Sequence, residues 1–156
     1  HDFRRNNISI EVKSQKLRDE NTCTINGIEQ LVAPEDAELY FVHCVFEQDD
    51  QGVSIPDMKE MLEDLGVPPS ELEQKLNDAD FDYSQIEKYR DPKRKFKLVR
   101  MEYYLVDDSF PKITPASFID NQVPDSVTEV RYKINLVTAR PLEDGAADRM
   151  LQDFCI

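Results

Sequence analysis

Several features of common protein classes are missing from this chain. Its four glycines form no Gly-rich phosphate loop, and neither an internal repeat nor a low-complexity stretch is present. No run approaches the roughly 18 apolar residues of a membrane-spanning helix, and no basic-apolar leader typical of a signal peptide is visible. The sequence therefore predicts a protein with no membrane partner.

Cysteine is also scarce. Cys23, Cys44 and Cys155 are widely separated and odd in number, a pattern that resembles neither a zinc spacing nor a disulfide framework. Cys44 lies in the apolar run at residues 39–46, where a small buried thiol is the simplest interpretation. We therefore expect a cytoplasmic protein.

The start of the chain lacks an initiator methionine. The sequence begins at His1, already inside a strand-turn-strand pattern, so we expect an N-terminally truncated fragment. Its 156 residues, 40% of them apolar, fit one domain with a real core. We predict a single domain over residues 1–156, with a helical insert over residues 54–90.

Lysines and arginines are fewer than aspartates and glutamates, but many of them are concentrated in two clusters. The formal net charge of −13 argues against simple nucleic-acid binding, which normally needs a basic surface. Residues 29–82 carry sixteen acids against two bases. A basic cluster is more often a solvated loop than a phosphate contact, a preference that reverses if the second cluster folds beside the N-terminal motif. The two clusters consist of Arg4, Arg5, Lys13, Lys16 and Arg18, and of Lys88, Arg90, Lys93, Arg94, Lys95, Lys97 and Arg100.

Hydrophobic periodicity predicts strands and short helices. The expected strands cover residues 8–14, 22–26, 39–47, 96–106 and 127–137. The expected helices cover residues 28–33, 54–66 and 84–90, with a further helix opened by a capping box at Ser70 and a weakly helical tail at 150–154. Asp49–Gly52 has the composition of a turn. His43, inside the third strand, is more simply a packed, hydrogen-bonded histidine than a ligand.

The most informative pattern lies in the first fourteen residues. Alternation within the strand that begins at Ile8 places Glu11 and Lys13 on one face. The polar turn at residues 4–7 can fold Asp2 back beside Glu11 on a neighbouring strand. Two carboxylates and one ammonium then converge on one spot, as metal-dependent phosphodiester cleavage requires.

The residue types explain this chemistry. Carboxylates are hard oxygen ligands suited to Mg²⁺, and such a metal polarises a phosphoryl oxygen and lowers the pKa of a bound water. Asp2 and Glu11 are the predicted metal ligands, with the carbonyl of Val12 as a third, and Lys13 orients the water or offsets charge on the phosphate. The alternative is a solvent-facing ion pair within the Glu-x-Lys triplet, worth only about 0–1 kcal/mol.

Six segments together resemble the PD-(D/E)XK motif protein family. The resemblance covers nearly the whole chain but lacks the family's N-terminal part. It implies a restriction-endonuclease-like α/β core, Mg²⁺ or Mn²⁺ as the cofactor, and cleavage of DNA in a bacterial restriction-modification or phage-defence system. The segments are His1–Phe3, Ile10–Ser14, Ile25–Leu31, Leu39–Phe41, Phe110–Thr114 and Val130–Ile134.

The resemblance also implies roles for individual residues. Asp2 matches the first motif acid, Glu11 the second and Lys13 the motif lysine. Gln30 matches a glutamine on the helix after the core strands, where a polar group supports the site in related nucleases; an exposed helix residue is an equal alternative. His1 stands where the motif has proline, which is not its chemical part.

We therefore predict an α/β domain whose mixed sheet carries the Asp2, Glu11 and Lys13 site, followed by the helical insert and a β-rich C-terminal portion. The rival interpretation is a non-catalytic DNA-binding or adaptor subunit, with the acidic helices at residues 54–82 facing other restriction or defence subunits. The intact Asp/Glu/Lys set favours the enzyme, and the net acidity favours the adaptor. The predicted DNA-binding residues are Arg4, Arg5, Lys16, Lys93, Arg94 and Lys95.

Overall fold

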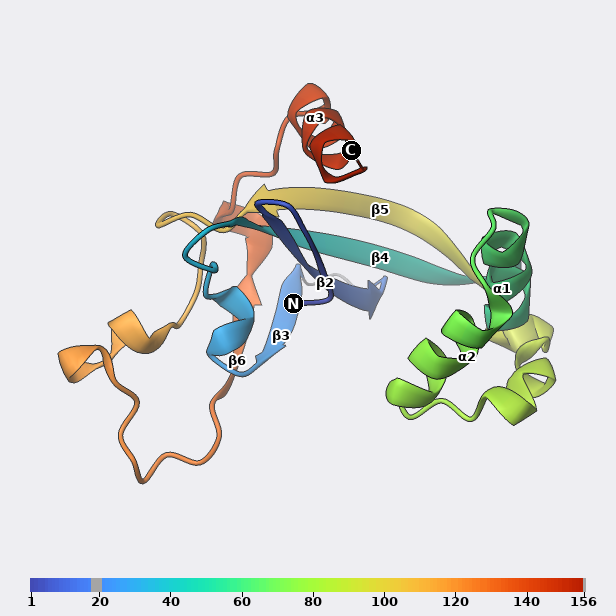
Figure 1. The fold of residues 1–156 in the computed structure, drawn as a ribbon, viewed down its shortest axis with the longest axis horizontal. Helices are drawn as coiled ribbons and strands as arrows, with labels where there is room; N and C mark the ends of the chain where they lie inside the picture. Colours follow the sequence, from blue (N-terminus) through green and yellow to red (C-terminus); the bar gives the residue numbers. More distant parts are fainter. Residues whose placement is uncertain (18–20, 156) are drawn as a thin grey trace. The chain divides into compact units, whose positions relative to one another are not determined.

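The computed structural model of the protein describes residues 1–17 and 21–155. The chain forms two compact units, one from residues 1–45 and 100–156 and the other from residues 46–99 (Figure 1). The single-domain organisation and the insert at residues 54–90 stay predictions. Arg18, counted in the first basic cluster, lies outside the described residues. No helix in the described part of the chain is long and apolar enough to cross a membrane.

The first unit is built on a four-stranded mixed sheet in the order β1-β2-β4-β5. These strands span Phe3–Arg5, Ile8–Lys16, Glu38–Val53 and Phe96–Leu105, and β4 and β5 continue into the second unit. β1 and β2 pair antiparallel. A separate antiparallel ribbon joins β3 (Thr22–Asn26) to β6 (Arg131–Asn135).

Side-chain alternation along the strands gives the sheet two apolar faces, and each face has its own cluster. Leu39 and Phe41 of β4 face the β3–β6 ribbon, while Val42, the residue after Phe41, faces α3 (Asp144–Cys155), which lies over that side in Figure 1. The ribbon cluster contains Cys23, Ile25, Leu31, Leu39, Phe41, Tyr104, Val106, Phe110, Ile134 and Leu136. The helix cluster contains Ile8, Ile10, Val42 and Met150.

Most of the expected elements form, and the differences have local causes. The strand expected at residues 22–26 is confirmed, and α3 is longer than the tail helix expected at residues 150–154. The strand expected at residues 127–137 is reduced to β6, which ends where the Asn135 side chain accepts a bond from Val137 N at 2.9 Å and starts a 3-10 turn. The helix expected at residues 28–33, which contains Gln30, forms only a 3-10 turn, Glu29–Leu31.

His43 is packed as expected, but the prediction that it is hydrogen-bonded is wrong. Its side chain is fully buried in β4, and neither ring nitrogen has a hydrogen-bond partner among the described residues. The nearest carboxylate oxygen, Glu102 Oε2, lies 3.7 Å from Nδ1, which is too long for a hydrogen bond. Burial lowers the pKa of His43, Glu102 opposes that shift, and Arg100 reinforces it. The imidazole is therefore neutral at pH 7.

This buried imidazole makes stability depend on pH. Below its ordinary pKa of 6.5 the unfolded chain protonates His43 while the folded protein resists protonation, so stability is lost as the pH falls through that value. We expect the melting temperature of His43→Leu, relative to that of the wild type, to rise between about pH 8 and about pH 5. Parallel melting-temperature curves for the two proteins over this range would contradict the expectation.

The second unit contains the continuation of β4 and β5 and two helices. The turn expected at Asp49–Gly52 is wrong, because these residues belong to β4 and Asp49 N donates to Lys95 O at 3.2 Å. Gly52 permits this pairing, since a Cβ there would lie 2.5 Å from the carbonyl carbon of Phe96. A sequence-local turn signal was therefore overridden by a strand partner more than forty residues away.

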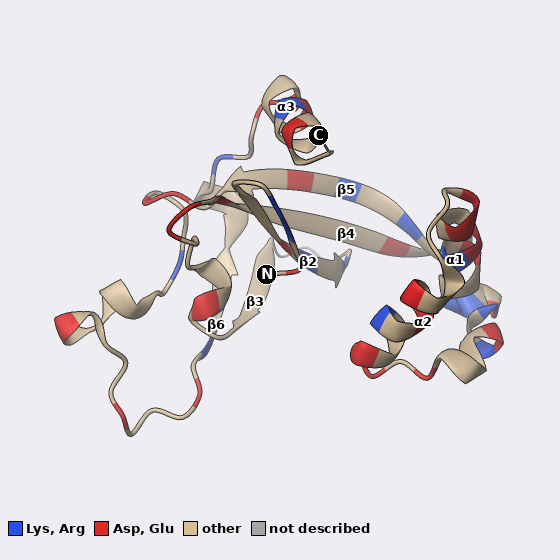
Figure 2. Ribbon diagram, in the orientation of Figure 1, with Lys and Arg blue, Asp and Glu red and all other residues tan. Residues whose placement is uncertain are grey.

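The helices of this unit are α1 (Ile55–Asp64) and α2 (Pro69–Asp78). Ser54 starts α1 with a reciprocal capping box to Asp57. The capping box expected at Ser70 is wrong, because Pro68 is the N-cap of α2, no side chain caps it, and proline occupies the first helical position. Acidic residues are frequent on both helices in Figure 2.

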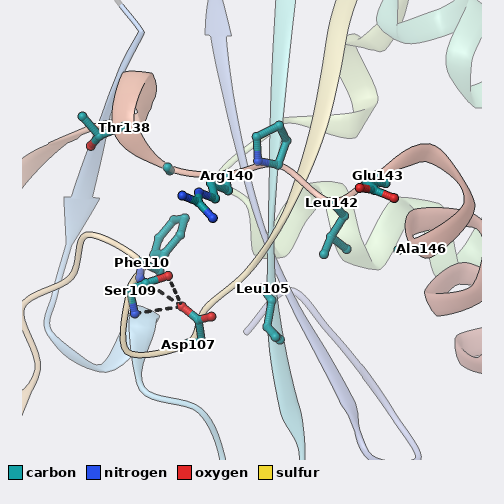
Figure 3. A pocket seen from close by; sticks show the side chains of 11 residues that line it. Leu105, Asp107, Ser109, Phe110, Thr138, Arg140, Leu142, Glu143 and Ala146 are labelled. Carbon is teal, nitrogen blue, oxygen red and sulfur yellow. Dashed lines mark hydrogen bonds between the residues drawn. The ribbon is translucent and has the colours of Figure 1, made fainter.

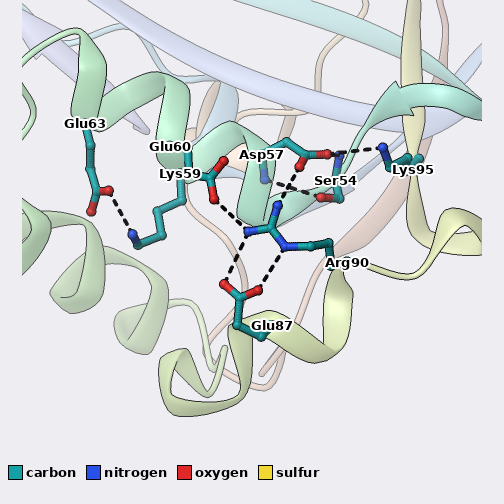
Figure 4. Close-up of polar contacts among 8 residues, drawn as sticks. All are labelled: Ser54, Asp57, Lys59, Glu60, Glu63, Glu87, Arg90 and Lys95. Atoms are coloured by element: carbon teal, nitrogen blue, oxygen red, sulfur yellow. Dashed lines mark hydrogen bonds and ion pairs between the residues drawn. The ribbon is translucent and has the colours of Figure 1, made fainter.

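Much of the second basic cluster is used inside this unit. Arg90 reaches Asp57 at 3.0 Å, Glu60 at 2.7 Å and Glu87 at 2.9 Å, an arrangement shown in Figure 4. Lys95 Nζ lies 3.6 Å from the second carboxylate oxygen of Asp57. These contacts hold the 3-10 segment Tyr83–Tyr89 against α1 and satisfy charges that the sequence alone leaves open.

Candidate functional site

The β1–β2 hairpin positions the predicted site. Its register pairs Phe3 with Ile10 and Arg5 with Ile8, leaving a two-residue turn in which Asn6 takes a positive φ of 52°. Asparagine tolerates this left-handed conformation better than most residues. Continuing the register by one residue places Asp2 opposite Glu11, and directly opposed residues of an antiparallel pair point to the same face.

The structure places Asp2, Glu11 and Lys13 in the same hairpin, where Glu11 and Lys13 form an ion pair. Lys13 Nζ lies 2.8 Å from Glu11 Oε1. The other oxygen of Glu11 lies 3.6 Å from His1 Nδ1, and Asp2 Oδ2 accepts a hydrogen bond from Val12 N at 2.7 Å. Glu11 and Lys13 are in contact, as strand alternation predicts, and Asp2 binds the main chain of the residue after Glu11. The convergence of all three on one metal site stays a prediction.

Burial separates this ion pair from an ordinary surface pair. The Glu11 side chain is 4% exposed and that of Lys13 is 20% exposed, so the carboxylate is buried and the ammonium reaches the surface. A buried carboxylate is costly unless it is paired, and Lys13 and His1 provide that pairing. The alternative of a solvent-facing pair does not describe Glu11.

His1 is the site neighbour that sequence reasoning missed. His1 stands in the place of the motif proline, and its Nδ1 lies 3.6 Å from Glu11 Oε2 while its Nε2 lies 3.1 Å from the carbonyl oxygen of Val32. The signal was present in the hairpin, because the residue next to Asp2, just before β1, lies near the strand that carries Glu11.

A groove adjoins Lys13, and we name it the Lys13 groove. It has a volume of about 410 Å³ and lies where the end of β2 meets the β3–β6 ribbon. Cys23 borders it with a thiol whose pKa burial raises to about 11, against an opposing effect of the nearby Lys13 ammonium. The lining residues are Lys13, Ser14, Gln15, Lys16, Thr22, Cys23, Thr24, Asn26 and Lys133.

Gln30 has a local structural task. Its side-chain oxygen accepts a hydrogen bond from Asn26 N at 3.0 Å, which closes the turn between β3 and the 3-10 segment. It is half-buried, so the alternative of a simply exposed helix residue does not describe it. A supporting role for Gln30 at the site stays a prediction.

The predicted DNA-binding residues have varied surroundings, and their role stays a prediction. Arg4 pairs with Asp36 at 2.7 Å on an exposed surface, and Arg5 donates to the carbonyl of Cys155 at 3.0 Å. Lys16 lines the Lys13 groove. In the other unit, Arg94 stacks over the Tyr89 ring at 4.5 Å, Lys95 pairs with Asp57, and Lys93 belongs to a short 3-10 turn.

The donor types at this site fit a hard divalent cation. Asp2 and Glu11 offer carboxylate oxygens, and Val12, the residue after Glu11, adds a main-chain carbonyl oxygen. Within residues 1–17 and 21–155, no group of three or more histidine, cysteine, aspartate or glutamate side chains is placed to hold a metal ion. A cation here would therefore depend on main-chain oxygen, water and substrate phosphate for its remaining ligands, which is how Mg²⁺ is commonly held.

A larger hollow in the first unit contains none of the predicted site residues. It has a volume of about 720 Å³ and is bordered by the loop after β5 and by the start of α3. Figure 3 shows Asp107 turned into its own loop, where its Oδ1 accepts bonds from Ser109 N and Oγ. These hydrogen bonds lower the pKa of Asp107. Although this hollow is larger than the Lys13 groove, its size alone does not make it a candidate for phosphodiester cleavage.

Comparison with protein families identifies the chain. The family described as "Putative PD-(D/E)XK family member, (DUF4420)" matches residues 1–137, a range that includes Asp2, Glu11 and Lys13. The chain belongs to this family. Comparison with curated proteins and with solved structures gave no match. The mixed α/β architecture agrees with the restriction-endonuclease-like fold expected for a PD-(D/E)XK protein.

Proposed function

We propose that this chain hydrolyses phosphodiester bonds in DNA at the site formed by Asp2, Glu11 and Lys13. The observation that carries the proposal is the hairpin geometry, which sets Asp2 opposite Glu11 and holds Lys13 Nζ 2.8 Å from the Glu11 carboxylate. Membership in a PD-(D/E)XK family supports the same reaction class. A place in a restriction-modification or phage-defence system belongs to this proposal as well.

Asp2, Glu11 and the carbonyl of Val12 would hold Mg²⁺ or Mn²⁺. When bound, the cation supplies Lewis-acid polarisation of the phosphate and a lowered pKa for water. The chain's own contribution is to hold both carboxylates on one rigid hairpin, because Asp2 is fixed to Val12 N and Glu11 is buried beneath the surface. Rigid strands fix such ligands more precisely than loops do.

Lys13 supplies the positive charge for the reaction itself. Hydrolysis forms a bond from a water oxygen to phosphorus and breaks the bond from phosphorus to the leaving sugar oxygen, while the water loses a proton and the sugar oxygen gains one. Negative charge grows on the phosphate during this exchange, and an ammonium aimed at it lowers the barrier. The half-buried Lys13 is anchored by Glu11 and still reaches the surface, as this task requires.

One observation favours a non-catalytic DNA-binding or adaptor role instead. Both oxygens of Glu11 face cationic or potentially cationic groups, and Asp2 is occupied by a main-chain donor, so the carboxylates already have protein partners. A hairpin whose Asp2 and Glu11 carboxylates only stabilise the fold would show the same contacts. Cation binding distinguishes the two roles.

Calorimetry with Mg²⁺ tests the proposal directly. We expect the wild type to bind Mg²⁺ and the double variant Asp2→Asn/Glu11→Gln to lose that binding, because both carboxylate charges are removed while the side-chain shapes are kept. Asp36→Asn, which removes an exposed carboxylate that pairs with Arg4, should bind Mg²⁺ as the wild type does. Equal binding by the double variant and the wild type would favour the adaptor.

A further inference from the structure

The Lys13 groove differs in charge from the rest of the chain. The protein carries 32 acids against 19 lysines and arginines, yet Lys13, Lys16 and Lys133 line this groove. The other described lining residues are neutral, and five of them bear hydroxyl or amide groups that can donate hydrogen bonds. Such a surface suits a chain of phosphates, which proteins contact with lysines, hydroxyls and amides.

The β3–β6 ribbon explains why these groups face one way. Cys23 and Ile25 of β3 pack into the ribbon cluster, so the alternate residues Thr22, Thr24 and Asn26 point to the other face. Lys133 of β6 is paired directly with Thr24 and therefore shares that face. These polar side chains therefore share one face of the ribbon because the apolar residues of β3 occupy the other face.

Lys133 differs from the other two lysines in its partners. Lys13 is held by Glu11, and Lys16 makes contacts of its own. The exposed Lys133 side chain forms no ion pair or hydrogen bond with any residue of the described chain, and its neighbour on the same face, Arg131, likewise forms none. Because no described residue pairs with either cation, both are available on the ribbon to an external anion.

We propose that the Lys13 groove holds the sugar–phosphate backbone of the DNA strand that is cut, with Lys133 as a backbone contact opposite Lys13. This inference rests on the proposed function, because it takes DNA as the substrate. The groove's volume of about 410 Å³ leaves room for phosphates together with ordered water. Contacts of this kind set the register of the strand without reading its sequence. Lys133 is accordingly a positioning residue.

Salt-dependent DNA binding tests the role of Lys133. We expect Lys133→Ala to reduce the slope of log affinity against log salt by about 0.9, measured by fluorescence anisotropy with labelled duplex DNA between about 50 and 200 mM KCl. At about 0.1 M salt, losing one such contact corresponds to roughly eightfold weaker binding. The loss should be equal for two duplexes of unrelated sequence, and Lys133→Arg should restore most of the affinity.

The matched control is Lys75→Ala, which removes one exposed lysine from α2 and changes the net charge by the same amount. This variant should bind DNA as the wild type does. The exposed Lys133 side chain forms no ion pair or hydrogen bond with the residues that the structure describes, so Lys133→Ala should melt at the wild-type temperature. In a cleavage assay Lys133→Ala should raise KM and leave kcat unchanged, which a merely structural role would not produce.

The outcomes separate this inference from the function on which it rests. Lys133→Ala that binds DNA like the wild type, or no more weakly than Lys75→Ala, overturns the groove assignment. A loss confined to one DNA sequence also overturns it, since that would indicate base recognition. If cleavage requires Lys13 while Lys133→Ala changes neither DNA affinity nor KM, the assignment of the groove to the DNA backbone is wrong and the proposed nuclease function stands. If the wild type shows no salt-dependent DNA binding, both fail.

Discussion

Lys13→Ala is expected to lower the cleavage rate by about 10²–10³-fold, the usual cost of removing a group that stabilises developing charge. Its ammonium is fixed 2.8 Å from Glu11 Oε1 and is partly exposed, so it can reach a phosphate while Glu11 stays buried. DNA affinity should change little, because the Lys13 charge is already offset by Glu11. A single-turnover assay with duplex DNA and Mg²⁺, alongside anisotropy, measures both quantities.

Lys13→Ala should also destabilise the fold, and this effect must be separated from its effect on the cleavage rate. Lys13→Ala leaves a 4%-exposed carboxylate with only the more distant His1 beside it, and breaking a buried pair by removing one partner costs about 3–5 kcal/mol. The variant Lys13→Ala/Glu11→Gln removes both charges and should regain much of that stability while staying inactive. Lys13→Met keeps most of the side-chain volume and serves as a second check.

A kinetic contrast strengthens this test. Lys13→Ala should lower kcat with little effect on DNA affinity, while Lys133→Ala should do the reverse. Loss of cleavage and of DNA binding in parallel in Lys13→Ala, with the protein still folded, would mean that Lys13 only attracts DNA. A folded Lys13→Ala that cleaves at the wild-type rate would remove Lys13 from the proposed chemistry altogether.

Local pattern predicted the part of the site that lies within one hairpin. Asp2, Glu11 and Lys13 are separated by no more than eleven positions, so strand alternation and one turn sufficed to bring them together. The burial of Glu11 could not be read in the same way. In the sheet β2, which carries Glu11, lies between β1 and β4, and β4 is a strand that comes only after β3 along the chain.

Strand pairing between segments far apart in the sequence explains the features that local sequence patterns did not predict. Lys133 comes near the site only because β6 pairs with β3 across more than a hundred residues, and nothing around Lys133 in the sequence indicates that partner. The Asp49–Gly52 segment has the composition of a turn but is drawn into β4 by its pairing with β5. Short-range chemistry is a sound guide where partners are adjacent, and it weakens where the partner is remote.

Phe41→Ala should be the most damaging substitution outside the candidate site. Phe41 is fully buried in β4, and its ring lies 5.3 Å from that of Phe110 and 6.4 Å from that of Tyr104. These residues belong to the cluster that joins the sheet to the β3–β6 ribbon. Truncating a buried phenylalanine to alanine costs about 3–5 kcal/mol, a large share of the roughly 5–15 kcal/mol that holds a domain folded.

Urea unfolding followed by circular dichroism measures this loss, and Phe3→Ala provides the matched control. Phe3 is 55% exposed in β1, so its removal should change the free energy of unfolding by no more than about 0.5 kcal/mol. Because the ribbon carries Lys133 and Thr24, loosening the cluster around Phe41 should also weaken DNA binding at temperatures where the variant remains folded. Equal stability of the two variants would mean that the cluster around Phe41 does not hold the sheet and the ribbon together, and the groove between them would then lack a rigid wall.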